Sequence, residues 1–359
     1  MLPTAMKPAL VRTPRLGALA MRTFSSSGDP LVLVEKKDKY AVVRMNRPPV
    51  NSLNTALIRE LDAIIKKLED DKSVRGIILA SSNQKVFSAG LDIMEMYQPQ
   101  PATITKFWTS LQDLYLRLYT TRLAAVAAIE GHSPAGGCLL AMCCDYRIMT
   151  SGKPMIGLNE TQLGIVAPTW FRDTFVNTVG HREAEKMLGL GLQVDATKAK
   201  AIGLVDEAVA LEEVFPRAEA AMARWLTIPD MARVKTKLLM RQETADRLIA
   251  IREKDLEAFT DFAQTDKVQK SLGVYLASLK KNIGVSSPLH STFVLQKIAP
   301  SLRMIGEKPC RATCTHLRRR REKCSYGMRL AYLPVVEVAT AYHTTQSSRL
   351  LAKKTPHGS

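Results

Sequence analysis

The sequence predicts an α/β region over residues 31–210, followed by an all-helical region over residues 211–281. In the first region, short apolar runs typical of buried strands alternate with segments whose apolar residues recur at helical spacing. After residue 211 the helical spacing continues without a strand-like run. Strands that alternate with helices favour parallel pairing through helical crossovers. With 46% hydrophobic and 24% charged residues, the 359-residue chain can bury a core of ordinary size.

Each element is predicted from its own pattern. The expected strands are residues 40–45, 76–80, 124–129 and 146–149. The first strand ends at Pro48 and Pro49, because proline cannot donate to a ladder. The helices expected in this region are residues 55–69, 103–119 and 135–144. The helices expected after residue 211 are 218–226, 231–243, 256–263 and 267–280, and Pro229 with Asp230 is a start signal for one of them.

The composition of the N-terminus predicts a mitochondrial targeting signal. Residues 1–28 contain Lys, Arg, Ser and Thr but no acid, which is the composition of a transit peptide. Residues 22–25 resemble a matrix-processing site, so we expect residues 1–30 to be a transit peptide and the mature chain to lie in the mitochondrial matrix. A merely disordered basic start is the alternative. No uncharged apolar stretch of about 18 residues occurs, so no membrane span is expected.

The formal charge of +17 is unevenly distributed. It divides into +3 for residues 1–30, +10 for residues 282–359 and +4 for residues 31–281. Because the central body is only mildly basic, a nucleic-acid surface is not expected there. The basic tail, residues 282–359, matches no known pattern and is expected to be disordered, with a nucleic-acid tail as the alternative.

The six cysteines form two groups. Cys138, Cys143 and Cys144 lie in an apolar run and are expected to be buried thiols. The other three lie in the tail with His316, at a spacing that fits no trusted metal pattern, so no metal site is predicted. Nothing suggests a disulfide framework, in agreement with a reducing compartment.

Two segments place backbone amides where a ligand can reach them. Residues 86–93 (VFSAGLDI) follow a predicted strand, and their small side chains let a ligand approach the backbone. Residues 131–138 (GHSPAGGC) join a strand to a helix, with Gly136 and Gly137 at the positive end of that helix. Both segments favour binding of an oxyanion, although each alone is also typical of an ordinary tight turn.

A third segment carries an acid. Glu160 is the single carboxylate in residues 156–164 (IGLNETQLG), an otherwise neutral and largely apolar stretch. Desolvation would raise its pKa and make it a usable proton shuttle. Taken alone, a solvated glutamate or one at a helix start would be the better explanation.

The three segments together resemble the crotonase (enoyl-CoA hydratase/isomerase) superfamily. The resemblance covers residues 31–281 and includes 45–48, 87–93, 135–145 and 158–164. Residues 87–92, 134–139 and 156–164 are most similar to the mitochondrial members that isomerise 3-enoyl-CoA. The resemblance implies a spiral of ββα units followed by a helical C-terminal region that mediates assembly, usually as a homotrimer.

The resemblance also implies roles for individual residues. Glu160 matches the catalytic carboxylate, and the amides of Leu91 and Gly136 match the pair that polarises a thioester carbonyl. The residues that match acyl-CoA contacts are Ala89, Gly90, Leu91, Asp92, Ile93, Gly136 and Asn159. The implied reaction moves the double bond of 3-enoyl-CoA to give 2-trans-enoyl-CoA in the β-oxidation of unsaturated fatty acids. It needs no metal or other cofactor, because coenzyme A is part of the substrate.

One position departs from the hydratase pattern. Hydratases of this superfamily use two glutamates to hold and activate water, but the first of these positions is Leu139 here. Leucine can neither hold nor deprotonate water, so hydration is disfavoured. The alternatives are a hydratase with weak activity, an RNA-binding protein on the same scaffold, and a protein that only binds acyl-CoA.

Other residues are weaker candidates. His132 is expected to be structural. Phe107, Trp108 and Trp170 can line an acyl pocket, but a core position is favoured. The cations at positions 233, 235 and 237 can meet the phosphates of coenzyme A, but exposed helix charges are usually solvated.

Overall fold

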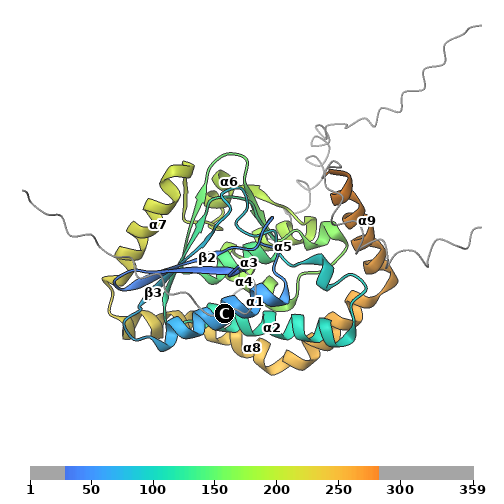
Figure 1. Ribbon diagram of the computed structural model, residues 1–359, viewed down its shortest axis with the longest axis horizontal. Helices are drawn as coiled ribbons and strands as arrows, with labels where there is room; N and C mark the ends of the chain where they lie inside the picture. Colours follow the sequence, from blue (N-terminus) through green and yellow to red (C-terminus); the bar gives the residue numbers. More distant parts are fainter. Residues whose placement is uncertain (1–28, 283–359) are drawn as a thin grey trace, which may run out of the picture. The chain divides into compact units, whose positions relative to one another are not determined.

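The sheet at the centre of the fold has six strands, in the order β1-β2-β3-β4-β6-β9 (Figure 1). The computed structural model describes residues 29–282. The strands are β1 (Val32–Lys36), β2 (Tyr40–Met45), β3 (Gly76–Ser81), β4 (Ala124–Ile129), β6 (Tyr146–Thr150) and β9 (Glu207–Val209). β1 pairs antiparallel with β2, and every other neighbouring pair is parallel. The predicted parallel pairing is therefore confirmed.

A second, small sheet lies at the site. It contains β5 (Ser133–Pro134), β7 (Met155–Gly157) and β8 (Val194–Asp195), with β5 and β7 parallel and β7 and β8 antiparallel. These strands are only two or three residues long, which is too short to give a periodic pattern. The pairing of β5 with β7 holds residues 133–134 in register with residues 156–157. The sequence did not predict these short strands.

The helices show where the predictions were right and wrong. The helices are α1 (Thr55–Asp70), α2 (Pro101–Thr120), α3 (Gly136–Cys143), α4 (Thr169–Val179), α5 (His181–Leu190), α6 (Ala196–Ala201), α7 (Leu211–Leu226), α8 (Asp230–Gln264) and α9 (Asp266–Asn282). Two short 3-10 helices, η1 (Ile93–Glu95) and η2 (Glu160–Leu163), lie at the site. The separate helices expected over residues 231–243 and 256–263 were wrong, because residues 244–255 contain no Gly or Pro and α8 runs through them.

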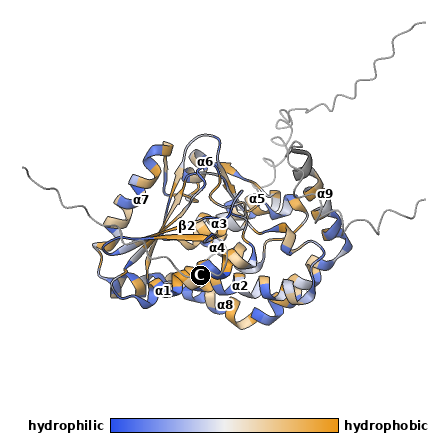
Figure 2. Cartoon of the chain, viewed as in Figure 1, coloured by the Kyte–Doolittle hydropathy of each residue, from blue (hydrophilic) through white to orange (hydrophobic). Residues whose placement is uncertain are grey.

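The two faces of the large sheet are covered by different helices. Alternate residues of β3 and β4, such as Ile77 and Ala125, pack in the main core, to which α1, α2 and α3 contribute their buried faces. Their neighbours Ile78 and Val126 face the other way and pack against Met222 and other residues of α7. Figure 2 shows β2 as hydrophobic and α8 as a mixture of hydrophobic and hydrophilic residues. Residues far apart in the sequence therefore belong to one layered body.

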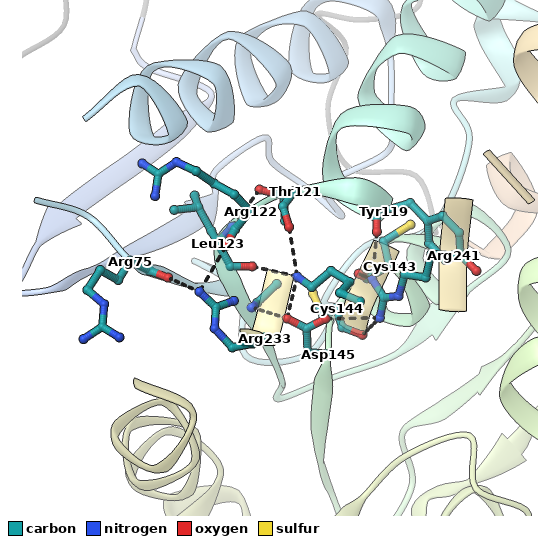
Figure 3. Close-up of polar contacts among 12 residues, drawn as sticks. Arg75, Tyr119, Thr121, Arg122, Leu123, Cys143, Cys144, Asp145, Arg233 and Arg241 are labelled. Carbon is teal, nitrogen blue, oxygen red and sulfur yellow. Dashed lines mark hydrogen bonds and ion pairs between the residues drawn. The ribbon is translucent and has the colours of Figure 1, made fainter. Parts of the chain in front are cut away.

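A buried polar cluster docks α8 onto the end of the sheet (Figure 3). Lys237 donates to the carbonyls of Thr121 and Leu123 and pairs with Asp145. Arg241 donates to the carbonyls of Tyr119, Cys143 and Cys144.

Arg233 is buried in the same region and donates to the carbonyl of Arg122. The expectation that the cations at 233 and 237 are solvated was therefore wrong, since both satisfy backbone carbonyls inside the protein, whereas Lys235 is exposed.

Several predictions concern segments outside the described residues. These are the transit peptide, apart from residues 29 and 30, the basic tail beyond residue 282, and the cysteines and histidine of that tail. Within residues 29–282, Cys138, Cys143 and Cys144 are buried free thiols, as predicted. No helix in this range is long and apolar enough to cross a membrane.

Candidate active site

Backbone hydrogen bonds bring residues 86–93 and residues 131–138 side by side. The Phe87 amide donates to the His132 carbonyl at 2.9 Å, and the His132 amide donates to the Lys85 carbonyl at 3.0 Å. Further along, the Leu53 amide donates to the Gly90 carbonyl, and the Asp92 amide donates to the Leu53 carbonyl. Gly90 and Asp92 therefore each direct a backbone polar group toward Leu53. The amide of Leu91, the residue between them, points in the opposite direction, because backbone polar groups alternate in direction along a strand.

Gly136 lies close to the backbone of Leu91. Gly136 is the first residue of α3, where the first four amides of a helix have no intrahelical partner. A Cβ placed on Gly136 would lie 3.3 Å from the Leu91 nitrogen and 3.2 Å from a methyl carbon of the Leu91 side chain. A side chain at this position would therefore crowd the Leu91 amide, which glycine leaves uncrowded.

The backbone before Gly136 has a special conformation. Ala135 has a φ of +49°, which is uncommon for a residue with a side chain, and its amide donates to the Gly157 carbonyl at 2.8 Å. Strained backbone of this kind persists where the surrounding structure fixes it, and it is concentrated at functional sites. The bond to β7 fixes the direction in which α3 begins.

Glu160 is a buried carboxylate without a hydrogen-bond partner. It is the first residue of η2, and 5% of its surface is exposed. Neither carboxylate oxygen has a partner within the described residues. Burial raises the pKa of Glu160 from 4.5 to about 7, because desolvation penalises the charged form. A carboxyl group with this pKa can both accept and return a proton near neutral pH.

A small apolar cavity adjoins Glu160. Its lining combines residues from both halves of the chain: Leu91, Met96, Trp108, Glu160, Ile165, Val166, Pro168, Phe171, Phe259, Phe262, Ala263, Val268 and Leu272. Glu160 is the only carboxylate among them. The cavity therefore places one proton-transfer group and one candidate oxyanion donor, Leu91, on the same apolar space, as in small-molecule sites generally.

Helix α9 closes this cavity and is held by Gln269. The Gln269 side chain donates to the Met96 carbonyl at 2.9 Å and accepts from the Gln98 amide at 2.8 Å. Val268 and Leu272, on either side of Gln269, line the cavity. These hydrogen bonds of Gln269, called the Gln269 clamp below, therefore join the loop after η1 to α9 across the site.

The remaining predicted site residues have mixed positions. Ala89 donates its amide to the Val50 carbonyl, and Gly90 has a φ of +84° that suits glycine. Asp92 pairs with Arg47 at 2.8 Å and caps η1, which begins at Ile93. None of these four lines the cavity.

Asn159 and His132 differ in their hydrogen bonding. Asn159 precedes Glu160, and its side-chain oxygen is buried without a partner within the described residues. An unsatisfied acceptor beside the acid favours contact with a ligand, because such a group is costly to leave unpaired. His132 accepts from the Met155 amide at 3.2 Å through Nδ1, in agreement with a structural role.

The sequence interpretation missed most of the cavity wall. Phe107, Trp108 and Trp170 all lie in the core, as favoured, and Trp108 also lines the cavity. Phe259, Phe262, Val268 and Leu272 were not identified as site residues. Their helical spacing indicated a buried face but not which surface that face covers. Within residues 29–282, no group of three or more His, Cys, Asp or Glu side chains could hold a metal ion.

Comparison with known proteins agrees with this geometry. The sequence matches the enoyl-CoA hydratase/isomerase family over residues 35–284. It is 50% identical over 255 residues to mouse "Enoyl-CoA delta isomerase 1, mitochondrial", covering 71% of this chain and 88% of the relative. It is also 33% identical to a short-chain-enoyl-CoA hydratase of Clostridium acetobutylicum, covering 52% of this chain and 72% of that one.

The fold is also similar to that of a solved structure. The crystal structure of human mitochondrial delta3-delta2-enoyl-CoA isomerase superposes with a TM-score of 0.70 at 48% identity. The match covers 71% of this chain and all of the human chain. From the family match, the close relatives and the shared fold, the chain belongs to the enoyl-CoA hydratase/isomerase family.

Proposed function

We propose that this protein is a mitochondrial Δ3,Δ2-enoyl-CoA isomerase that converts 3-cis- or 3-trans-enoyl-CoA into 2-trans-enoyl-CoA. The observation that carries the proposal is the single, unpaired carboxylate of Glu160 on an apolar cavity that Leu91 also lines. One acid/base group suffices for an isomerisation, because the proton removed from one carbon is returned to another. The names of the mouse and human relatives support the same activity.

The mechanism follows from these groups. Glu160 removes a proton from C2, and the negative charge spreads onto the thioester oxygen as a dienolate. The amides of Leu91 and Gly136 stabilise that oxygen, and a single donor of this kind contributes about 3–4 kcal/mol. The protonated Glu160 then delivers its proton to C4. The pKa of about 7 suits both steps, since neither protonation state is strongly favoured near neutral pH.

Hydration is disfavoured by the residue at position 139. Addition of water requires a second group to hold and activate it, and Leu139 occupies the matching position. Leu139 is fully buried in the main core. We therefore expect no formation of 3-hydroxyacyl-CoA from 2-trans-hexenoyl-CoA.

The proposal extends to the setting of the enzyme. Ala89 to Ile93, Gly136 and Asn159 are the proposed acyl-CoA contacts, and no metal or redox cofactor takes part in the proton transfers. The protein is proposed to act in the mitochondrial matrix, which the composition of residues 1–28 supports. A homotrimer formed through residues 211–281 is supported by Leu239 and Met240 of α8, which are 84% and 75% exposed.

The test is turnover of 3-trans-hexenoyl-CoA by the full-length chain and by Glu160→Gln. We expect the wild type to form the 2-trans product and the variant to lose that activity while still binding acyl-CoA. The matched control is Glu130→Gln, because Glu130 is also buried, with its pKa raised by burial, but does not line the cavity. Full activity in Glu160→Gln would remove this residue from its role. A wild-type chain that binds acyl-CoA without turnover would contradict the isomerase assignment.

A further inference from the structure

Asp255 of α8 accepts hydrogen bonds from side chains of two other helices. Its Oδ2 lies 2.7 Å from the Trp108 indole nitrogen and 2.8 Å from the Gln112 amide nitrogen, both on α2. It also lies 3.2 Å from the indole nitrogen of Trp170 on α4. Trp108, Gln112 and Trp170 are all almost fully buried. One carboxylate oxygen therefore connects three helices behind the cavity.

Trp108 is fixed from its edge and from its face. Phe259 stacks on it with 3.5 Å between ring centroids and an interplanar angle of 7°. Phe259 follows Asp255 by four residues, so both project from one face of α8. Trp170 packs edge-on against the same ring at 5.7 Å. These contacts leave the Trp108 ring no alternative orientation without breaking a hydrogen bond or a stacked pair.

The carboxylate has a role that packing alone does not explain. An apolar side chain at position 255 would avoid the cost of desolvating a charge, but it would leave three buried N–H donors without this acceptor. A charged acceptor instead gives directional hydrogen bonds that are stronger than neutral ones. Its effect is therefore to set the orientation of the Trp108 ring, which lines the cavity together with Phe259 and Glu160.

We propose that Asp255 is a positioning residue that holds Trp108 against Phe259 as a fixed wall of the acyl cavity, and that this wall restricts the length of the acyl chain. The inference rests on the proposed function, because it takes the acyl chain of a CoA thioester as the occupant. The continuity of the cavity from Leu91 and Glu160 to Trp108 and Phe259 supports this occupant. A wall of two stacked, pinned rings excludes additional methylene groups where mobile side chains would yield.

The experiment compares binding of saturated hexanoyl-CoA and dodecanoyl-CoA to the full-length chain by calorimetry. Trp108→Ala opens the wall and is expected to shift the ratio of the two Kd values at least tenfold in favour of dodecanoyl-CoA. Asp255→Leu removes the acceptor and is expected to shift the ratio at least threefold in the same direction. Asp255→Asn keeps a carbonyl acceptor and is expected to retain a ratio close to that of the wild type.

A purely structural role predicts a different outcome. It would lower the unfolding midpoint in urea and weaken both ligands equally, leaving the ratio unchanged. An unchanged ratio in folded Trp108→Ala or Asp255→Leu overturns the proposal. If those variants do not fold, Trp108→Phe removes the indole donor and keeps an aromatic face. An unchanged ratio in Trp108→Phe then overturns the proposal, and a shift toward dodecanoyl-CoA supports it.

Binding of saturated ligands separates this proposal from the isomerase assignment. A shifted ratio in variants of a chain that shows no turnover supports the wall and contradicts the isomerase. Turnover by the wild type with an unchanged ratio in the variants supports the isomerase assignment and contradicts the wall. A wild-type chain that binds neither thioester overturns both.

Discussion

Lys237 of α8 and Asp145, the residue before β6, form a buried ion pair with 2.7 Å between Nζ and Oδ2. The ammonium group also donates to the carbonyls of Thr121 and Leu123, so each of its three protons has an acceptor. Asp145 in turn accepts from the Ala125 amide of β4. The pair therefore connects α8 to the central sheet.

Replacing the lysine should destabilise the protein. Lys237→Met leaves the carbonyls of Thr121 and Leu123 without this donor and leaves Asp145 with Arg241 as its remaining ion-pair partner. A buried polar group that loses its partner costs about 1–3 kcal/mol. We expect this loss in the free energy of unfolding measured with urea. Lys235→Met is the matched control, because Lys235 is exposed two residues earlier on the same helix. Equal free energies for the two variants would show that the pair does not stabilise the docking of α8.

Activity should depend on pH near neutrality. Glu160 must be ionised to accept the C2 proton, and burial raises its pKa to about 7. We expect kcat/KM to rise with pH to a plateau, with a midpoint near 7, and to fall about tenfold per unit below it. Glu130→Gln should have the same profile. A midpoint near 4.5 would show that the site is wetter than its burial indicates.

Stability should depend on pH in the opposite sense. Because burial raises the pKa of Glu160, the folded protein retains a proton that the unfolded chain loses between pH 4.5 and about 7. The contribution of protonated Glu160 to the free energy of unfolding is fully present below pH 4.5 and is lost as the pH rises through about 7. Relative to Glu160→Gln, we expect the wild type to lose about 3 kcal/mol of unfolding free energy between pH 5 and 8. A difference between the two proteins that stays constant with pH would contradict the raised pKa.

A methyl group at Gly136 should impair catalysis. The added Cβ of Gly136→Ala would lie 3.3 Å from the Leu91 nitrogen, so it crowds the proposed oxyanion donors. We expect a fall in kcat of about 10²-fold, comparable to the loss of one oxyanion donor. Gly189→Ala in α5 is the control, because a Cβ there meets nothing within 4 Å. Unaltered kcat in Gly136→Ala would place the thioester oxygen elsewhere.

Loss of the Gln269 clamp should loosen α9. Gln269→Ala removes the hydrogen bonds to Met96 and Gln98, so opening of the helix should become easier. We expect faster hydrogen exchange over residues 266–277 and a higher KM for 3-trans-hexenoyl-CoA. Lys270→Ala, at the exposed neighbouring position, should change neither quantity. Unchanged exchange would indicate that apolar contacts alone hold α9.

The sequence predicted the fold where local pattern and tertiary role agree. β3 and β4 are buried along their whole length, so their continuous apolar runs identified them. β1 has one buried and several exposed residues, and β9 has only three residues, so neither carries a strong pattern. The same reasoning missed the burial of Lys237, because helical periodicity does not reveal that carbonyl groups need a donor at that point.

The site was predictable only in its local parts. Glu160, Leu91 and Gly136 belong to short segments whose composition indicates their chemistry, and the structure places Glu160 and Leu91 on one cavity. The contribution of Phe259 depends on the path of α8, which passes the site about 100 residues after Glu160. Long-range packing of this kind has no signature in a local window of sequence.

The residues that form the walls of the cavity lie far apart along the chain. Leu91 enters the cavity from the loop after β3, whereas Val268 and Leu272 enter it from α9, near the end of the described residues. A polypeptide that ends before Asp266 already contains every strand of both sheets and the acid itself. It lacks Val268 and Leu272, so the cavity is complete only when α9 is in place.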